Sequence, residues 1–483
     1  MMNRVLFFIL LLSIWNSFLF FGNKLGISVI LFIVPLLGVI LYCLYKKKVI
    51  KRKRGFLLII PIILLSCCYF IFDNSFFKFF NIIVIILLFM FMYIITVRPY
   101  FRVFNFFKDC FALLVGPIGC VFDIIEIILE KLCCCIKLSS VLKKRIKSFI
   151  FILPIIIIIL WLLISADMVF DFMIGGFFRN IGRVLLDIFE WNLFGRVILV
   201  FIVFFSISSS LYFVVNDYLE FVPESCLKNK EDDSGLKKFR LDVDTVKILF
   251  IILSIIYVLF DVIQIKSLIF HSVSYDINYS EYARQGFFQL MVVSFINLFL
   301  LLFSKKYYDD DKGNVRFFKF ISLLIIGLTF VIIVSSFMRM NLYESHYGYT
   351  FLRLLVYIVL ITEIIMLIPT VIYILRDNYN VFWRYFVIII CVYVIINYIN
   401  IDYVIAYRNI DRYYQLKDID LEYLENGDAD NLGILFDFYN SVKDKEIKSD
   451  LEDYFSNLNL YDEDFQEFNL SRNRGYNLIK KLK

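Results

Sequence analysis

The sequence has almost no histidine and lacks the short motifs of nucleotide- and metal-dependent enzymes. Only 2 of its 483 residues are His, and its 10 Cys form no Cys-x-x-Cys pair with a nearby His. A structural zinc site needs four such ligands, so we expect no metal site and no disulfide framework. Walker A, dinucleotide-binding Gly, His-Glu-x-x-His and Gly-x-Ser-x-Gly motifs are all missing. The sequence therefore predicts no metal, no cofactor and no nucleotide-binding domain.

Polar residues are also scarce, which excludes a soluble fold. The chain is 61% hydrophobic, against about 45–50% for soluble proteins, and its mean hydropathy is +0.79. Apolar runs long enough to cross a bilayer of about 30 Å recur from end to end. Helices are the form in which such runs span a membrane. We therefore predict an all-α, polytopic helical membrane protein with about 11 transmembrane helices.

Basic clusters between the apolar runs predict the orientation of the spans. Lys and Arg gather in residues 46–54, 98–147 and 305–319, and such clusters stay on the cytoplasmic side. The N-terminus is then cytoplasmic, and eleven spans put the C-terminus outside. The expected spans are residues 5–21, 25–45, 56–72, 79–97, 149–164, 193–215, 246–269, 287–303, 320–338, 354–375 and 382–401. We also expect no leader cleavage after the first run, because no small-x-small site follows it.

Two segments leave the span count open. Residues 111–132 are apolar but interrupted by Gly116-Pro117, and their acidic residues share one helical face, which favours an interfacial helix within a cytoplasmic linker of about 98–148. Residues 168–192 are half polar, and we expect them to lie on the outer surface. Counting just one of the two as a span would invert everything that follows. Residues 216–240 form the most loop-like stretch, expected in the cytoplasm.

The last part of the chain, residues 402–483, differs in composition from the rest. It is polar and acidic, and apolar residues recur in it at helical spacing. We expect a small, separate helical domain of three or four short helices on the outer side, following a transmembrane domain of residues 1–401. Asp420 and Asp428 are expected to cap two of these helices.

Charged and aromatic residues at the expected outer edge form the main candidate site. Arg side chains there are suited to hold a phosphate or carboxylate by forked hydrogen bonds, and a Glu or His is suited to act as a base or proton carrier. The alternative is that these residues only anchor helix ends and form an aromatic belt. The candidate ligand-binding residues are Glu281, Arg284, Arg339, Tyr343, Glu344, His346 and Arg353.

A second candidate set lies inside the expected spans, where ionisable groups are costly and mark function by default. Glu363 follows Arg353 by ten residues, about 15 Å along a helix, so we expect it near mid-membrane. A proton or cation pathway and a plain interhelical hydrogen bond both remain open. Its expected partners are Asp261, Gln264 or Asn297, and the candidate coupling residues are Asp261, Gln264 and Glu363.

Several stretches from residue 165 onward together resemble one group of proteins. They are residues 165–170, 279–290, 339–344 with 347–350 and Arg353, 400–402 with 405–406 and Asn409, and 469–472. They resemble the bacterial multi-pass membrane proteins of domain of unknown function 4173 and its relative 4153. The resemblance implies a multi-pass protein of a bacterial membrane and no particular activity. The first 100 residues contribute no matching motif.

The leading hypothesis is a non-enzymatic protein of the bacterial cytoplasmic membrane. It would bind or move a small anionic or lipid-like molecule through an outward-facing Arg/Glu/Tyr pocket. One alternative is a membrane-embedded transferase or hydrolase acting on a lipid-linked substrate. Another is a sensor or assembly factor whose residues 402–483 bind an envelope protein. Beside the lipid bilayer, these are the expected partners. Nucleic acid is not expected, because the basic residues follow the cytoplasmic face.

Overall fold

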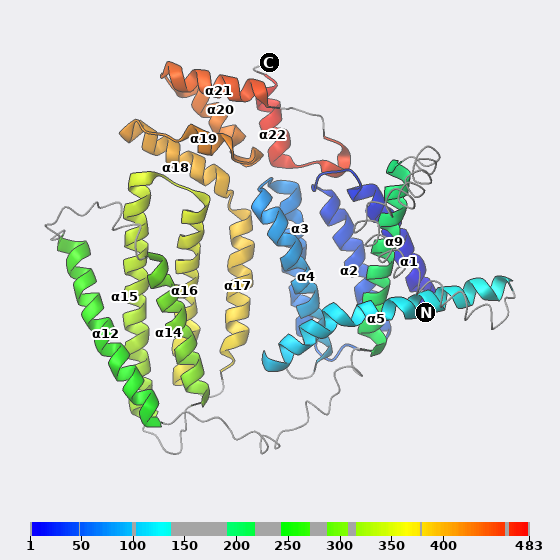
Figure 1. Cartoon of the computed structure of the whole chain (residues 1–483), viewed down its shortest axis with the longest axis horizontal. Coiled ribbons are helices and arrows are strands. Elements are labelled where there is room, and N and C mark those ends of the chain that lie inside the picture. The colour runs from blue at the N-terminus through cyan, green and yellow to red at the C-terminus, as the bar shows by residue number, and fades with distance from the viewer. Residues whose placement is uncertain are drawn as a thin grey trace, which may run out of the picture. The chain divides into compact units, whose positions relative to one another are not determined.

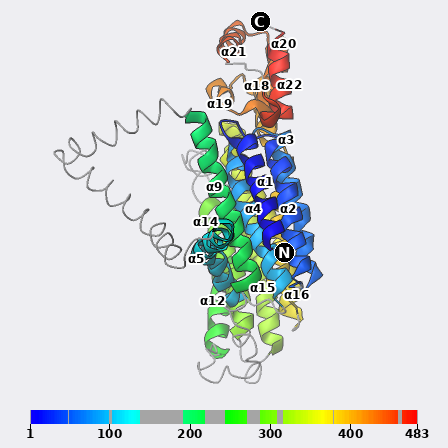
Figure 2. The same ribbon diagram turned by 90° about the vertical axis from the view of Figure 1, so that its right-hand side faces the viewer.

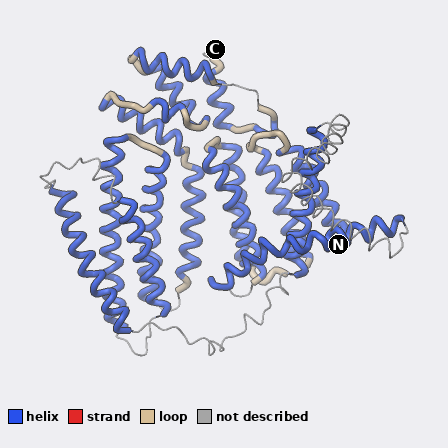
Figure 3. Tube along the Cα trace, in the orientation of Figure 1, coloured by secondary structure: helices blue, strands red, loops and turns tan. Residues whose placement is uncertain are grey.

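The chain is helical wherever its structure is described. The computed structural model describes residues 2–47, 49–98, 103–136, 191–217, 243–270, 287–307, 315–376, 379–458 and 463–481. Within these ranges there are helices and loops but no strand (Figure 3). By length and composition, nine described helices are able to cross a membrane, and the shorter helix Arg4–Phe20 is also apolar. The predicted all-α, polytopic membrane protein is confirmed. The span expected over 149–164 falls outside the described ranges, and so does the segment expected on the outer surface over 168–192, apart from Trp191 and Asn192.

The chain folds into two compact units, each built from segments that are separated in the sequence. We call them unit 1, comprising Met1–Cys67, Ile83–Lys228 and Glu463–Phe468, and unit 2, comprising Cys68–Ile82, Asn229–Asp462 and Asn469–Lys483. Helices α3 (Ile59–Ile71) and α4 (Ser75–Val97) contribute residues to both. Each unit is described by itself below.

Unit 1 contains upright helices and one transverse helix. The upright ones include α1 (Met2–Phe20), α2 (Ser28–Lys46) and α9 (Trp191–Tyr212). Helix α5 (Val103–Ile136) runs across them in Figure 1 and is seen nearly end-on in Figure 2. It continues through Gly116-Pro117, where the sequence suggested an interruption. A helix that lies along a membrane surface has this orientation.

Unit 2 is built around helices packed side by side (Figure 1). They are α12 (Val243–Phe270), α14 (Phe287–Tyr307), α15 (Val315–Tyr347), α16 (Phe351–Leu375) and α17 (Val381–Tyr398). Their shared core includes Phe250, Leu301, Phe318, Ile333 and Leu360. Because lipid is as apolar as these residues, tight packing and polar contacts, rather than water exclusion, hold such helices together.

Helix α15 is longer than the sequence suggested. Residues 339–350 were expected to form a loop, but the helix continues to Tyr347. None of residues 339–347 is Gly or Pro, so nothing in the sequence ends the helix earlier. The turn comes at Gly348, whose φ is +79°, and a Cβ atom there would lie 2.7 Å from Asn409 Oδ1. The glycine is therefore required by both backbone conformation and close approach.

The last part of the chain, residues 402–483, is called the tail below. Its described part contains five α-helices, more than the three or four expected. They are α18 (Ile401–Leu416), α19 (Leu421–Glu425), α20 (Leu432–Ser441), α21 (Lys445–Asn457) and α22 (Leu470–Ile479). Asp420 caps α19 as expected, accepting a hydrogen bond from the Tyr423 backbone N–H at 3.0 Å. Asp428 makes no capping hydrogen bond in its own turn. Its carboxylate instead binds Ser75.

Candidate functional site

The interior of the α12, α14, α15 and α16 bundle contains polar side chains among its apolar residues. On α15, Ser322, Thr329 and Ser336 recur every seven residues and are fully buried, so they share one helical face. Buried polar residues on the four helices are Ser254, Asp261, Ser294, Asn297, Ser304, Ser322, Thr329, Ser335, Ser336, Arg339, Glu344, Glu363 and Thr370. The ionisable residues among them are rare within spans and mark functional sites by default.

Glu363 is the most deeply buried carboxylate of this bundle, with 0% of its surface exposed. Its Oε2 lies 2.5 Å from the hydroxyl oxygen of Ser294 on α14. Its Oε1 has no hydrogen-bond partner among the described residues. Of the three partners expected from the sequence, neither Asp261 nor Asn297 bonds Glu363 in the described part of the chain, and the side chain of Gln264 lies outside it. An unpaired buried charge is expensive, and a bound proton or cation would remove that cost.

Asn297 belongs to a separate, satisfied network. The Tyr257 hydroxyl donates to its Oδ1 at 2.6 Å, and its Nδ2 donates to Thr329 Oγ1 at 3.0 Å. The Thr329 hydroxyl donates in turn to the Ile325 carbonyl oxygen at 2.7 Å. These bonds tie α12, α14 and α15 together beside the Glu363 site. This role is the interhelical polar contact that membrane helices commonly use.

Asp261 is a second buried carboxylate, on α12, and it is 4% exposed. Neither of its carboxylate oxygens has a hydrogen-bond partner in the described part of the chain. It makes no ion pair or hydrogen bond with Glu363 there, so the structure does not join these two coupling candidates. The side chain of Gln264, the third candidate, lies outside the described residues.

The outer-edge candidates gather only in part. Glu344 is 2% exposed, and its polar neighbours are Tyr357, Arg353 and Arg408. Arg408, on α18, was not singled out from the sequence, because nothing local to it indicates that α18 packs on α16. Arg339 is 7% exposed, one and a half turns before Glu344 on α15. Glu281 and Arg284, and the side chain of His346, lie outside the described residues.

Arg353 binds its own chain. Its guanidinium donates to the carbonyl oxygens of Tyr347, at 3.0 Å, and of Gly348. It also lies 4.4 Å from the ring centroid of Tyr343 and donates to the hydroxyl of that residue at 3.3 Å. These contacts place a positive charge on the last carbonyl groups of α15, a stabilising arrangement at a helix C-terminus. For Arg353 and Tyr343 the helix-anchoring alternative is therefore the one with direct contacts behind it.

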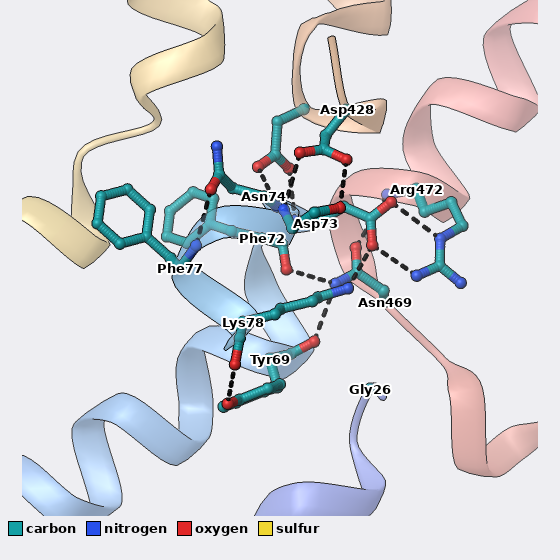
Figure 4. A network of polar contacts seen from close by, with 12 residues as sticks. Gly26, Tyr69, Phe72, Asp73, Asn74, Phe77, Lys78, Asp428, Asn469 and Arg472 are labelled. Carbon is teal, nitrogen blue, oxygen red and sulfur yellow. Dashed lines mark hydrogen bonds and ion pairs between the residues drawn. The ribbon is translucent and has the colours of Figure 1, made fainter. Parts of the chain in front are cut away.

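A second polar cluster, which we call the turn cluster, joins the tail to the turn between α3 and α4 (Figure 4). It comprises Asp73, Asn74, Ser75, Lys78, Asp402, Asp428, Asp430, Asn469 and Arg472. The Asp430 carboxylate accepts from the backbone N–H groups of Asp73 and Asn74 at 2.8 and 3.1 Å. Asp428 accepts from the Ser75 N–H at 2.8 Å. The tail carboxylates thus satisfy N–H groups at the positive N-terminus of α4.

The other tail residues bind the preceding helix. Asn469 donates from Nδ2 to the carbonyl oxygens of Tyr69 and Phe72, at 2.9 and 2.7 Å, near the end of α3. Arg472 donates to Asp73 from Nε at 3.1 Å and from its terminal nitrogen at 2.5 Å, and Lys78 pairs with the same carboxylate. Sequence reasoning assigned these residues no role, but residues 402, 469 and 472 fall in the resembling stretches 400–402 and 469–472.

The turn cluster shifts the pKa values of its acids in opposite directions. Burial disfavours ionisation of Asp73, but the hydrogen bonds and charges of Arg472 and Lys78 outweigh it and hold the pKa below its usual value. Burial raises the pKa of Asp402 to about 7, and the nearby carboxylates of Asp430, Asp428 and Asp73 add to that rise. Asn74 opposes it by donating to Asp402 at 2.8 Å. Burial likewise raises the pKa of Asp430.

Unit 1 offers a different kind of space. A cavity of about 930 Å³ lies between α2, α4, α5 and α9, with Leu36, Phe89, Ile118 and Phe205 among its lining residues. Its few polar lining groups include Ser206, Ser209 and Ser210, and none of the described residues that line it is charged. Unit 1 also buries an acid, Asp109 on α5, but that carboxylate accepts from the buried Arg98 at 2.7 Å.

These features define a multi-pass helical membrane protein with ionisable groups buried inside one of its bundles. Residues 59–437, more than half of the chain, match the family model described as Domain of unknown function (DUF4153). The chain belongs to this family. The match starts well before residue 165, where the resembling stretches begin, and ends before residues 469–472. No curated protein and no solved structure matches the chain. Membership of the related group 4173 stays a prediction.

Proposed function

We propose that the protein is a carrier of a bacterial cytoplasmic membrane that binds a small anionic or lipid-like molecule within unit 2 and moves it across the bilayer. The observation that carries this proposal is the burial of Asp261, Arg339, Glu344 and Glu363 inside membrane-length helices. Burying ionisable groups in a span costs several kcal/mol, on the order of 3 per group. Their presence is explained when these groups bind a solute or an ion during transport.

The charge distribution within unit 2 supports an orientation for this carrier. At the end away from the tail, the helix ends carry Lys305, Lys306, Arg316, Lys319 and Arg376. Such residues concentrate on the cytoplasmic side. The tail and the Arg339–Glu344 end of α15 then face outward, which is the side from which a solute would enter.

Arg339 is the residue we assign to the anionic group of the solute. A guanidinium presents a planar fork that matches a carboxylate or phosphate. Counting residues from the helix ends at Tyr347 and Phe351, on either side of the turn, Arg339 lies about 6 Å nearer to the tail than Glu363 along the bundle axis. An anion bound there would lie between the outer end of the bundle and the buried carboxylate.

The test is mass spectrometry of small molecules and lipids that co-purify with the full chain. We expect at least one species enriched with the wild type and lost from Arg339→Ala. The matched control is Arg384→Ala, because Arg384 is exposed near the opposite end of the bundle, against the ring of Tyr379. That variant should retain the species. Equal profiles from all three proteins, each monodisperse by size exclusion, would overturn the assignment.

A further inference from the structure

We propose that the coupling ion of this carrier is the proton, that Glu363 carries it, and that Ser294 is the positioning residue that accommodates both protonation states. The inference deepens the proposed function and rests on it. It is argued from the geometry of the contact between α14 and α16, from the number of oxygen atoms around Glu363 and from the positions of the nearby charged residues.

The Ser294 hydroxyl has two oxygen neighbours but only one proton to donate. Its Oγ lies 2.5 Å from Glu363 Oε2 and 2.7 Å from the carbonyl oxygen of Met291. When Glu363 is ionised, Ser294 donates to Oε2. When a proton from water binds Oε2, the new O–H donates to Ser294 Oγ, and the serine hydroxyl rotates to donate to Met291. No other covalent bond changes in the protein. Glu363 Oε2 and Ser294 Oγ share a hydrogen bond in both states, and Met291 accepts from Ser294 only when Glu363 is protonated.

The surroundings favour a proton over a metal cation. A hard cation needs several oxygen ligands at once, six to eight for Ca²⁺, whereas Glu363 has one oxygen partner, Ser294, among the described residues. In the same part of the chain, no group of three or more His, Cys, Asp or Glu side chains is placed to hold a metal. A proton needs only the carboxylate and its acceptor.

The charged groups on the helices packed against α16 lie toward the ends of the bundle. In the described residues they are Lys305 and Lys306 on α14, Arg316, Lys319, Arg339 and Glu344 on α15, Arg384 on α17, and Asp402, Arg408, Asp411 and Arg412 on α18. Arg339 is the one nearest to Glu363 along the axis. The protonation of Glu363 is therefore governed by its burial and by its contact with Ser294.

Infrared spectroscopy of the full chain in lipid nanodiscs tests the inference without a known solute. The probe is the proton itself, followed through the C=O stretch of carboxylic acids during a pH titration. We expect a band that is lost in Glu363→Gln and retained in Asp261→Asn. In Ser294→Ala the band should move to higher wavenumber, because the carboxyl group loses its hydrogen-bond acceptor. Ser254→Ala, a buried serine that bonds its own helix at Phe250, should leave the band unchanged.

Each outcome decides the question. Asp402 also titrates near pH 7 and contributes a band of its own, which Asp402→Asn identifies. If Glu363→Gln leaves every titrating band unchanged, or if the Asp402 band is the only one, the assignment of the proton to Glu363 is overturned. If Glu363→Gln does not fold, the band shift in Ser294→Ala against Ser254→Ala still decides. A confirmed band together with unchanged co-purifying species in Arg339→Ala would leave proton binding in place and remove the solute assignment. Failure of one proposal is thus distinguishable from failure of the other.

Discussion

The turn cluster and the bundle carboxylates, by which we mean Asp261 and Glu363, both place buried ionisable groups in unit 2. They differ in whether their polar atoms have hydrogen-bond partners. In the turn cluster each acid has a hydrogen-bond partner, and Asp73 has two cationic ones. In the bundle, both oxygens of Asp261 and one oxygen of Glu363 have none among the described residues. A satisfied buried network stabilises a particular arrangement of the chain, whereas an unsatisfied buried charge costs stability and persists where function needs it.

This contrast indicates a structural role for the turn cluster and a functional role for the bundle carboxylates. The tail carboxylates and Asn469 bind backbone groups on both sides of the turn between α3 and α4. That arrangement fixes the turn without creating chemistry there. The bundle carboxylates have no such backbone partners in the described part of the chain, and in the proposed function their protonation changes during transport. Substitutions should therefore lower stability in the turn cluster and change function, but not lower stability, in the bundle.

The largest effect on stability is expected from Arg472→Ala. Arg472 is 3% exposed and donates twice to Asp73, so its removal leaves a largely buried carboxylate with Lys78 as its remaining cation. Breaking a buried pair costs about 3–5 kcal/mol, and we expect about 3 here because Asp73 is partly exposed. The measurement is chemical unfolding in detergent. Arg474→Ala, two residues later on the exposed side of α22, should change the unfolding free energy by less than about 0.5 kcal/mol.

An equally large loss in Arg474→Ala would show that the turn cluster is not the source of the stability. The comparison would then reduce to a general sensitivity of α22 to substitution. A small effect of both variants would mean that the paired network adds little beyond the apolar core of the tail.

The next effect is a pH dependence of tail stability. The pKa of Asp402 is raised to about 7 in the folded chain, so the folded form binds its proton more tightly than the unfolded form does. Its stabilising contribution is complete below about pH 4, the ordinary range of an aspartate, and is lost as the pH rises through 7. Asp73, with a lowered pKa, acts in the opposite sense, but its contribution is lost only below its ordinary range.

Between pH 5 and 8 the chain should therefore lose about 1–2 kcal/mol of unfolding free energy, a value reduced from the full linkage because Asp402 is partly exposed. Thermal unfolding at the two pH values measures the difference. Asp402→Asn should abolish most of it. Asp411→Asn, exposed on the same helix, should leave it intact. A rise in stability with pH in the wild type would contradict the prediction.

Sequence patterns were enough to predict the class of fold and some of the buried charge. Long apolar runs determine membrane-length helices regardless of their partners, and an ionisable residue within such a run, such as Glu363, stands out without any structure. The length of α15 was misjudged because charge was taken as the sign of a loop. The helix continues to Tyr347, just before Gly348, because no residue before that glycine breaks it. Arg339 and Glu344 therefore lie on the helix, where they are buried inside unit 2.

The pairing of distant residues was beyond sequence reasoning. Asp430 binds the backbone N–H groups of Asp73 and Asn74, which precede it in the sequence by 357 and 356 positions. Ser294 and Glu363 form a hydrogen bond although 69 positions separate them. Nothing in the local pattern distinguishes Ser294 from the other serines of the spans. Ser294 is set apart only by the packing of the helices, because it lies on the turn of α14 that contacts α16 at Glu363. Arg408 likewise lies near Glu344 only because α18 packs on α16 in the folded chain.

The smallest effect is expected from Asp261→Leu, and here the free energy of unfolding should increase rather than decrease. This change replaces a buried carboxylate that has no described hydrogen-bond partner with an apolar side chain of similar size. Replacing buried charge by well-packed apolar groups is often neutral or stabilising by about 1–4 kcal/mol, and we expect about 1 kcal/mol of added stability. Val262→Leu, a lipid-exposed neighbour, should be neutral. Loss of stability in Asp261→Leu alone would mean that the carboxylate is paired in the folded protein, and Asp261 would then belong with the satisfied network of the turn cluster.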